Sequence, residues 1–338
     1  MIDDAFTQVV VLAAARARLA PSALLCQRRA MMSRDTPAGE LRSIRKVYGT
    51  VTAVDEVSLH VYPGEVLVVV GPNGSGKTTS MEILSGLRSP DSGEARISGD
   101  IVSGTFDARL RTGVQLQDSR LPGGLKVREA IHAKSALYVD PGPIDVIVDS
   151  MGLRSYLGTS VDKLSGGLQR RLDVAVACIG RPSLLILDEP TSGIDPDARG
   201  DMWHFFREVC SAGTAIITST HDLSEVEAFA DRMIVMTQGR VEAEGTVSEI
   251  LAGAGGTWRL RVSRPDEEVR RMLTDSELET RERASTVTVF GEREQITAIA
   301  DRLESMKHSG EGRYRDLLKG AIRLEDVFTS MTESGHDG

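Results

Sequence analysis

The chain has 338 residues, of which 41% are hydrophobic and 26% charged, and its formal net charge is −9 at pH 7. This length and composition predict a globular protein of about two domains with a sizeable core. The net negative charge argues against nucleic acid as the main partner, because binding to a phosphate backbone requires a basic surface. It does not exclude a local basic patch.

The apolar runs and the cysteines both point to a protein of the cytosol. The longest runs, "VVVLAAA" and "VLVVV", end at Arg16 and Gly71, well short of the roughly 18 residues of a membrane-spanning helix. We therefore expect no direct membrane span. Cys26, Cys178 and Cys210 show no CxxC spacing, and we interpret them as reduced, buried thiols.

Residues 1–38 differ from the rest of the chain. Their arginines are scattered through the apolar stretch instead of preceding it, so the segment lacks the layout of a signal peptide. Met31 and Met32 directly precede a polar, turn-rich stretch, "SRDTPAGE". We interpret the segment as an N-terminal extension that is disordered, weakly helical or an overlong reading frame, with the functional chain beginning at these methionines.

Strand signals follow the extension. The stretch "VSLHV" alternates apolar and polar residues, whereas "VLVVV", residues 66–70, is continuously apolar. A continuous run of this length is typical of a parallel strand that is covered on both faces.

The buried strand leads directly into a phosphate-binding pattern. "GPNGSGKTT" matches G-x-x-x-x-G-K-[ST], with the strand before it and the helix after it that this pattern requires. The glycines let backbone N–H groups approach phosphate oxygens at a helix N-terminus, Lys77 supplies a charge for the β and γ phosphates, and the Thr78 hydroxyl can ligate Mg²⁺. We predict a nucleotide-binding loop rather than an ordinary turn, formed by Gly71, Pro72, Asn73, Gly74, Ser75, Gly76, Lys77, Thr78 and Thr79.

A second short apolar run, Leu184 to Leu187, ends in Asp188 and Glu189. The carboxyl ends of strands in an open parallel sheet face its ligand crevice, so both acids are expected beside the phosphate loop. There Asp188 can hold Mg²⁺ and Glu189 can act as the general base that polarises the attacking water. The alternative is a solvated acidic turn. The order of strand, loop, long insert and acid-ended strand predicts an α/β sheet core.

Five motifs in order resemble the ATP-binding cassette (ABC) ATPases: "GPNGSGKTT", "LSGG", "LLILDEP", "SGID" and "STHD". The resemblance covers about residues 41–250. It implies an ABC ATPase domain at 39–250 with a mainly parallel central sheet, an antiparallel β subdomain and a helical insert at about 118–163. It also implies ATP and Mg²⁺ as cofactors, with Lys77 and His221 among the catalytic residues.

The resemblance assigns four further roles. Tyr48 matches an aromatic residue that stacks on adenine, unless it is simply a half-buried strand residue. Gln117, and not Gln115, falls at the position of a glutamine that meets Mg²⁺ or water and senses the transporter. We interpret Gln115 as a strand residue. His221 matches the histidine that contacts the γ-phosphate. Asp195 matches an aspartate that couples two sites, the alternative being an ordinary turn residue.

A second glycine-rich stretch, "LSGGLQRRL", is too distant in sequence to continue the first loop. In the ABC family this stretch closes over ATP that is held by another cassette, which implies a head-to-tail dimer. Ser165, Gly166 and Gly167 would then bind the partner's γ-phosphate at a helix that begins near Leu168. Leu168 stands where the family has glutamine. Gln169 is not a simple substitute, because one residue rotates a helical side chain by about 100°, so we expect a changed dimer contact.

The tail at 256–338 alternates strand, helix, strand, strand, helix, strand by periodicity, which predicts a small ferredoxin-like α+β domain. With "LEDVF" near its end, it resembles the ATPase subunits of bacterial drug and natural-product exporters of the daunorubicin-resistance type. We favour a dimer-stabilising appendage over a regulatory binding domain.

Together these features predict the ATP-hydrolysing subunit of an ABC exporter, a peripheral cytoplasmic protein on the inner face of the membrane. Its partners would be a second cassette and a separate permease that contacts Gln117 and the insert, with a drug, natural product or lipid-like molecule as cargo. The alternative is a soluble ABC ATPase that acts on nucleic acid or ribosomes, yet paired cassettes, coiled coils and basic surfaces are not visible. A non-catalytic, nucleotide-gated scaffold is disfavoured because Lys77, Asp188, Glu189 and His221 occur together.

Overall fold

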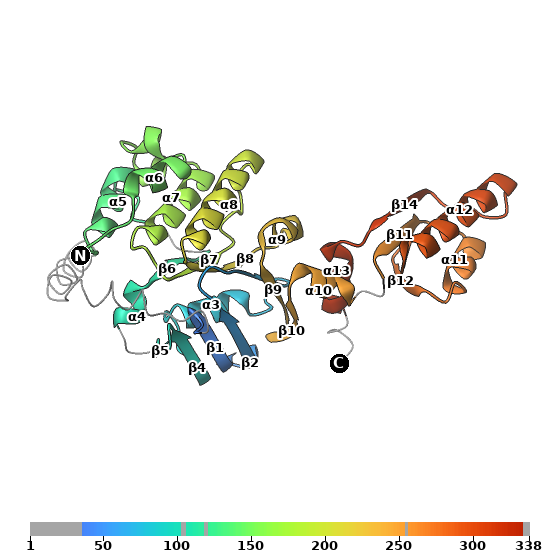
Figure 1. Ribbon diagram of the computed structural model, residues 1–338, viewed down its shortest axis with the longest axis horizontal. Coiled ribbons are helices and arrows are strands. Elements are labelled where there is room, and N and C mark those ends of the chain that lie inside the picture. Colours follow the sequence, from blue (N-terminus) through green and yellow to red (C-terminus); the bar gives the residue numbers. More distant parts are fainter. Residues whose placement is uncertain (1–35, 103–105, 118–120, 254–255, 334–338) are drawn as a thin grey trace. The chain divides into compact units, whose positions relative to one another are not determined.

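The computed structural model describes residues 36–102, 106–117, 121–253 and 256–333. The chain forms two compact units with the division after Ala243, and each unit is treated by itself below (Figure 1). Cys26 and residues 1–35 of the expected N-terminal extension lie outside the described residues.

The first unit contains two sheets. One is antiparallel in the pairs β1–β2, β1–β4 and β4–β5 and has the order β2-β1-β4-β5. The other has the order β10-β9-β3-β8-β7-β6, and its pairs β9–β3, β3–β8, β8–β7 and β7–β6 are parallel. The strands are β1 (Gly39–Tyr48), β2 (Val51–Val61), β3 (Val66–Val70), β4 (Ser92–Ile97), β5 (Asp100–Ile101), β6 (Thr112–Gln115), β7 (Leu184–Asp188), β8 (Ala215–Ser219), β9 (Arg232–Thr237) and β10 (Arg240–Gly245).

Helices cover the six-stranded sheet, and α7 and α8 lie on the side away from the antiparallel sheet (Figure 1). The insert between β6 and β7 is helical, as expected. The helices of this unit are α3 (Lys77–Leu84), α4 (Phe106–Leu110), α5 (Val127–Ser135), α6 (Ile144–Ser150), α7 (Gly166–Cys178), α8 (Pro196–Ser211) and α9 (Leu223–Phe229), with short 3-10 helices at Arg154–Tyr156 and Val161–Lys163.

The parallel strands are buried on both faces. Every residue of β3, β7 and β8 is buried, and alternate side chains of a strand point to opposite faces. Leu67 and Val69 of β3 therefore pack with Met81 of α3 and Val57 of β2 in one core, while the opposite face is covered by α7 and α8. The continuous apolar run predicted this double burial.

Because β3, β8 and β7 are parallel, their carboxyl ends lie at the same edge of the sheet. β3 ends at Val70, β7 at Asp188 and β8 at Ser219. The glycine-rich loop, the two acidic residues and the "STHD" motif therefore begin side by side, although they are far apart in sequence.

The second unit is an antiparallel sheet of order β12-β13-β11-β14 with two helices packed against it. Strand, helix, strand, strand, helix and strand follow in the predicted order, so the ferredoxin-like prediction is confirmed. Its core contains Leu260, Val289, Leu273 and Leu303. The elements are β11 (Trp258–Ser263), α11 (Glu267–Thr274), β12 (Glu279–Arg283), β13 (Thr286–Gly291), α12 (Arg293–Ser309) and β14 (Asp316–Ala321).

The "LEDVF" stretch opens the last helix, α13 (Leu324–Glu333), which packs against α10 (Val247–Ala252) in the same unit. Asp326 forms a largely buried ion pair with Arg259 of β11. The Asp326 carboxylate also accepts a hydrogen bond from the backbone N–H of Arg323 at 3.0 Å. The stretch therefore fixes the end of the chain to the sheet of its own unit.

The prediction of buried thiols is confirmed for the two cysteines among the described residues. Cys178 and Cys210 are free and buried, and burial raises the thiol pKa to about 12 for Cys178 and about 11 for Cys210. In the part of the chain that the structure describes, the helices are too short or too polar to cross a membrane.

Candidate active site

The glycine-rich loop connects the end of β3 to α3 and is closely packed. A Cβ atom at Gly71 would lie 2.2 Å from the carbonyl oxygen of Met236, and one at Gly76 would lie 2.5 Å from that of Ala53. Gly76 also has a φ of 98°, a left-handed conformation that glycine adopts without strain. Only glycine fits at both positions, and no side chain caps the N-terminus of α3. Its first N–H groups are therefore suited to an anion.

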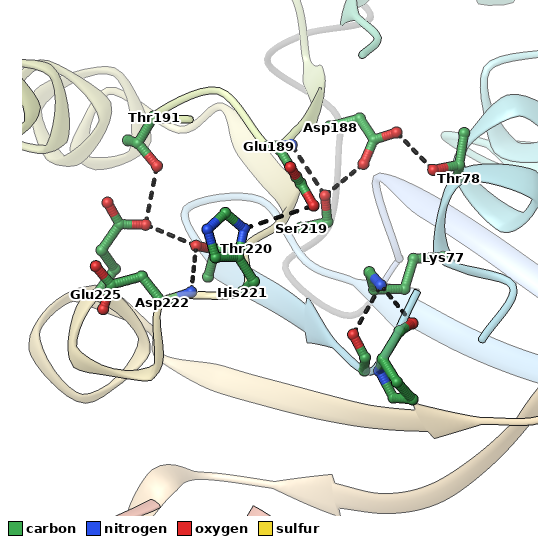
Figure 2. Close-up of polar contacts among 12 residues, drawn as sticks. Lys77, Thr78, Asp188, Glu189, Thr191, Ser219, Thr220, His221, Asp222 and Glu225 are labelled. Carbon is green, nitrogen blue, oxygen red and sulfur yellow. Dashed lines mark hydrogen bonds and ion pairs between the residues drawn. The ribbon is translucent and has the colours of Figure 1, made fainter. Parts of the chain in front are cut away.

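Lys77 is folded back onto the loop that carries it. Its Nζ donates to the carbonyl oxygens of Gly71 at 2.8 Å and Pro72 at 3.0 Å (Figure 2). The residue is only 7% exposed. Burial lowers the pKa of its ammonium group, against the opposing influence of Glu189 and Asp188. The two carbonyl contacts hold the charge of Lys77 within the loop.

Asp188 connects three segments of the chain. The Thr78 hydroxyl donates to Oδ2 of Asp188 at 2.8 Å, and the Ser219 hydroxyl donates to Oδ1 (Figure 2). Gln115 Nε2 lies 3.3 Å from the Asp188 carbonyl oxygen. Asp188 is 1% exposed, so its carboxylate is held in one position by neutral donors.

These oxygen atoms fit the predicted magnesium site. Among the described residues, no cluster of three or more His, Cys, Asp or Glu side chains could hold a metal ion. Mg²⁺ does not require one, because it is usually bound through one or two carboxylates, waters and substrate phosphates. Thr78 and Asp188 provide adjacent oxygens beside the phosphate loop, which is the donor set that such a site uses.

Glu189 adopts an unusual backbone conformation directly after β7. Its φ is 50°, a left-handed value that is uncommon outside glycine and that occurs at functional sites. Its N–H donates to Oγ of Ser219 at 2.9 Å. Oε1 of Glu189 lies 3.6 Å from Nδ1 of His221, whose side chain is 69% exposed. The two predicted catalytic side chains thus face each other across the ends of β7 and β8.

Other predicted site residues lie apart from this cluster. Tyr48 is 40% exposed at the end of β1, with Cζ of Arg88 5.2 Å from its ring centroid. Asp195 caps α8 by accepting from the N–H of Ala198 at 3.0 Å. Gln117 is exposed just beyond β6, and among the described residues no contact joins its side chain to the cluster. The structure confirms Gln115 as a strand residue.

The stretch "LSGGLQRRL" forms the first turns of α7. The helix begins at Gly166, so the expected start near Leu168 was wrong by two residues. The reason is that Ser165 caps the helix by accepting from the N–H of Leu168 at 3.3 Å. Ser165 and Gly166 are exposed. A Cβ atom at Gly166 would meet nothing within 4 Å, whereas one at Gly167 would lie 3.5 Å from the carbonyl oxygen of Gly193.

Leu168, which departs from the family pattern, and the neighbouring Gln169 both point into their own unit. Leu168 is buried with 9% exposure. Nε2 of Gln169 donates to the carbonyl oxygens of Val161 at 3.1 Å and Leu164 at 3.2 Å. The Gln169 side chain therefore supports the turn before the helix within the same unit.

Sequence reasoning missed Ser219, which contacts both Asp188 and Glu189. It also left Gln115 without a contact to the site. Gln115 ends β6 and Ser219 ends β8, and these two strands are the neighbours of β7, which ends in Asp188. Their positions at strand ends were visible in the sequence. The order of the strands in the sheet was not, so the sequence did not show that both residues lie beside Asp188.

Comparisons with known proteins place this geometry in a family. The sequence profile of the family described as ABC transporter matches residues 54–192. Nod factor export ATP-binding protein I of Cupriavidus metallidurans is 35% identical over 302 residues, which cover 87% of this chain and 96% of that protein. Daunorubicin/doxorubicin resistance ATP-binding protein DrrA of Streptomyces peucetius is 33% identical over 320 residues, which cover 90% of this chain and 95% of that protein.

Solved structures agree on the fold. The ATP binding subunit of an ABC transporter aligns with a TM-score of 0.61 and 25% identity, over 64% of this chain and 93% of that structure. A dimeric bacterial ABC transporter cassette aligns with a TM-score of 0.57 and 24% identity, over 62% of this chain and 98% of that structure.

Proposed function

The chain belongs to the ATP-binding cassette family of transporter ATPases, and from this premise we propose that it hydrolyses ATP to drive an exporter whose membrane-spanning subunit is a separate protein. The match to export and resistance ATP-binding proteins extends over 87% and 90% of the chain, and so beyond the cassette. The cargo class that fits these relatives is a drug, natural product or lipid-like molecule.

One observation carries the proposal: hydrogen bonds join the phosphate loop to Asp188 and, through Ser219, to the backbone of Glu189. Thr78 donates to Asp188, and Ser219 contacts both the Asp188 carboxylate and the Glu189 N–H. A nucleotide on the loop would therefore have its terminal phosphate next to a metal-binding carboxylate and a candidate base. A solvated acidic turn, the alternative, would leave Asp188 exposed.

The cofactors in this proposal are ATP and Mg²⁺. The backbone from Gly71 to Thr79 and the first turn of α3 would hold the β and γ phosphates, with Lys77 transferring its hydrogen bonds from loop carbonyls to phosphate oxygens. Thr78, Asp188 and Gln117 would hold the metal, and Tyr48 would stack on the adenine. Bound Mg²⁺ would neutralise charge that develops on the phosphates.

In the hydrolytic step we assign the general base to Glu189. Its carboxylate would accept a proton from the attacking water, and the fixed N–H···Ser219 contact would keep the carboxylate in place. His221, exposed and 3.6 Å from Glu189, would donate a hydrogen bond to the γ-phosphate. Lys77 would stabilise the charge on the same group.

We further propose that the site is completed by a second copy of the chain. Ser165, Gly166 and Gly167 would bind the γ-phosphate held by the other copy, and Asp195 would couple the two sites. The exposure of Ser165 and Gly166, with open space beside Gly166, supports this role. Because the Leu168 side chain is buried within one copy, we propose that its departure from glutamine acts through internal packing. The changed dimer contact that the sequence suggested stays a prediction.

The remaining assignments follow the family. The ABC ATPase domain would span 39–250 and the C-terminal domain 256–338, the latter acting as a dimer-stabilising appendage. A permease would contact Gln117 and the insert at about 118–163, which would place the protein at the inner face of the cell membrane.

The test is ATP hydrolysis by the purified chain and by its Glu189→Gln variant. The variant should bind Mg-ATP but hydrolyse it at least about a hundredfold more slowly, and ATP should convert it to a dimer in light scattering. Glu208→Gln, an exposed change on α8, is the matched control. Hydrolysis by Glu189→Gln at the wild-type rate would refute the assignment of the base.

A further inference from the structure

A buried carboxyl group lies beside the candidate catalytic residues and has no role in the mechanism above. Glu225 belongs to α9 and is 6% exposed. Its Oε2 accepts a hydrogen bond from the Thr191 hydroxyl at 2.9 Å and another from the Thr220 hydroxyl at 2.8 Å (Figure 2). A single oxygen atom thus joins two loops that are not neighbours in sequence.

The two threonines flank the residues that the mechanism uses. Thr191 is two positions after Glu189, on the segment that continues to Asp195. Thr220 directly precedes His221, and its hydroxyl also accepts from the N–H of Asp222 at 3.1 Å. The loop after β7 and the loop after β8 are therefore both tied to Glu225.

Packing alone does not explain a carboxyl group at this position. Oε1 of Glu225 is buried and has no hydrogen-bond partner among the described residues, and no cation in that part of the chain forms an ion pair with Glu225. A buried polar atom without a partner destabilises the folded state. A leucine would fill a similar volume without that penalty, so we expect the carboxyl group of Glu225 to serve the site.

We propose that Glu225 is a positioning residue for ATP hydrolysis. It holds the Glu189–Asp195 segment and the His221 loop in a fixed relation, so that the base and the histidine face the same phosphate. This inference rests on the roles proposed above for Glu189 and His221. Glu225 itself does not contact the nucleotide, so its loss changes the rate of the reaction and leaves nucleotide binding in place.

The test compares Glu225→Leu with Glu225→Gln in the full-length chain. Leucine removes the shared acceptor, and kcat should fall by about tenfold or more while KM for ATP changes less than about twofold, because small misplacements of catalytic groups have large effects on rate. Glutamine keeps one oxygen that can accept from both threonines and should retain kcat within about threefold. Glu227→Gln, an exposed change on the same helix, should match the wild type.

A second pair of variants tests whether Thr191 acts through Glu225. Thr191→Val should lower kcat in the wild-type background and have no further effect in Glu225→Leu, because residues that act as a unit are non-additive. If Glu225→Leu does not fold, Thr191→Val and Thr220→Val take its place. Each should lower kcat and leave KM for ATP nearly unchanged.

The outcomes separate this inference from the proposed function. Wild-type kcat in Glu225→Leu, or equal losses of kcat and ATP affinity that glutamine does not rescue, would overturn the positioning role and leave the ATPase assignment intact. Absence of hydrolysis by the wild type, alone and with a permease, would overturn both.

Discussion

The Thr78 hydroxyl donates a 2.8 Å hydrogen bond to Oδ2 of Asp188, a residue 110 positions later in the chain. This contact joins the first turn of α3 to the end of β7. It brings a hydroxyl and a carboxylate oxygen together before any ion is added. Binding of the proposed metal at this site would therefore require little rearrangement of the protein.

Thr78→Val and Asp188→Asn should each weaken the response to Mg²⁺. Valine removes a ligand oxygen and asparagine removes the negative charge, so the Mg²⁺ concentration for half-maximal ATP hydrolysis should rise by about tenfold or more. The measurement is a titration of the rate with Mg²⁺ at saturating ATP. Asp197→Asn, an exposed change on α8, should leave the titration unchanged, and an unchanged titration in Asp188→Asn would contradict the metal site.

Gly166→Ala should separate dimer function from stability of the single chain. A Cβ atom there would meet nothing within 4 Å in one copy, so the melting temperature should stay within about 2 °C of wild type. The same methyl group would enter the space proposed for the other copy's γ-phosphate, so hydrolysis should fall by about tenfold or more.

Gly200→Ala is the control for this change, because a Cβ atom at Gly200, which lies in α8, also meets nothing within 4 Å. It should leave the rate unchanged. ATP-dependent dimer formation, measured by light scattering in a Glu189→Gln background, should be lost only in Gly166→Ala. Normal hydrolysis and normal dimers in Gly166→Ala would place the phosphate contact elsewhere.

Asp173→Asn should stabilise the protein more at high pH than at low pH. Burial raises the pKa of Asp173 from 3.8 to about 6, with Arg170 opposing the shift. The folded state therefore binds the proton more tightly than the unfolded state, and stability falls as the pH rises from about 4 through 6. Asparagine cannot ionise and avoids that loss. The variant should melt at least about 2 °C above wild type at pH 8, with a smaller difference at pH 5. An equal difference at both values would show that ionisation of Asp173 is not the cause.

Asp326→Ala should destabilise the C-terminal unit. It leaves Arg259 largely buried without its partner, and loss of one member of a buried ion pair typically lowers the free energy of unfolding by about 3 kcal/mol or more. The double variant Arg259→Met/Asp326→Leu should recover most of that loss. Urea denaturation followed by the fluorescence of Trp258, in β11 of this unit, provides the measurement. Asp301→Asn, exposed on α12, is the control, and equal midpoints for wild type and Asp326→Ala would show that the pair is not stabilising.

The sequence predicted best where the signal is local. A continuous apolar run indicated β3, and alternation indicated the order of elements in the C-terminal unit, because periodicity reflects which faces are buried. Ser165 could also have indicated a helix start at Gly166, since serine is a favoured N-cap residue.

Contacts between distant segments could not be predicted in the same way. The contacts of Ser219 with Asp188 depend on β8 lying beside β7, and the contacts of Glu225 depend on where α9 begins. Threonine, serine and glutamate at these positions are common residues, and only the folded chain gives them a shared partner. The "LEDVF" stretch could be recognised from the sequence as a motif. Its ion pair with Arg259 could not be predicted, because Arg259 and Asp326 are far apart in the sequence.

The phosphate loop is supported by residues far from it in sequence. The carbonyl oxygens of Ala53 and Met236 lie against Gly76 and Gly71, and the N–H of Gly239 donates to the Ser75 carbonyl oxygen at 3.1 Å. The segment "GPNGSGKTT" is consequently not expected to keep its conformation when it is transferred alone into another protein. A graft into another scaffold would need to include the start of β2, the end of β9 and the β9–β10 turn, because these segments pack against the loop.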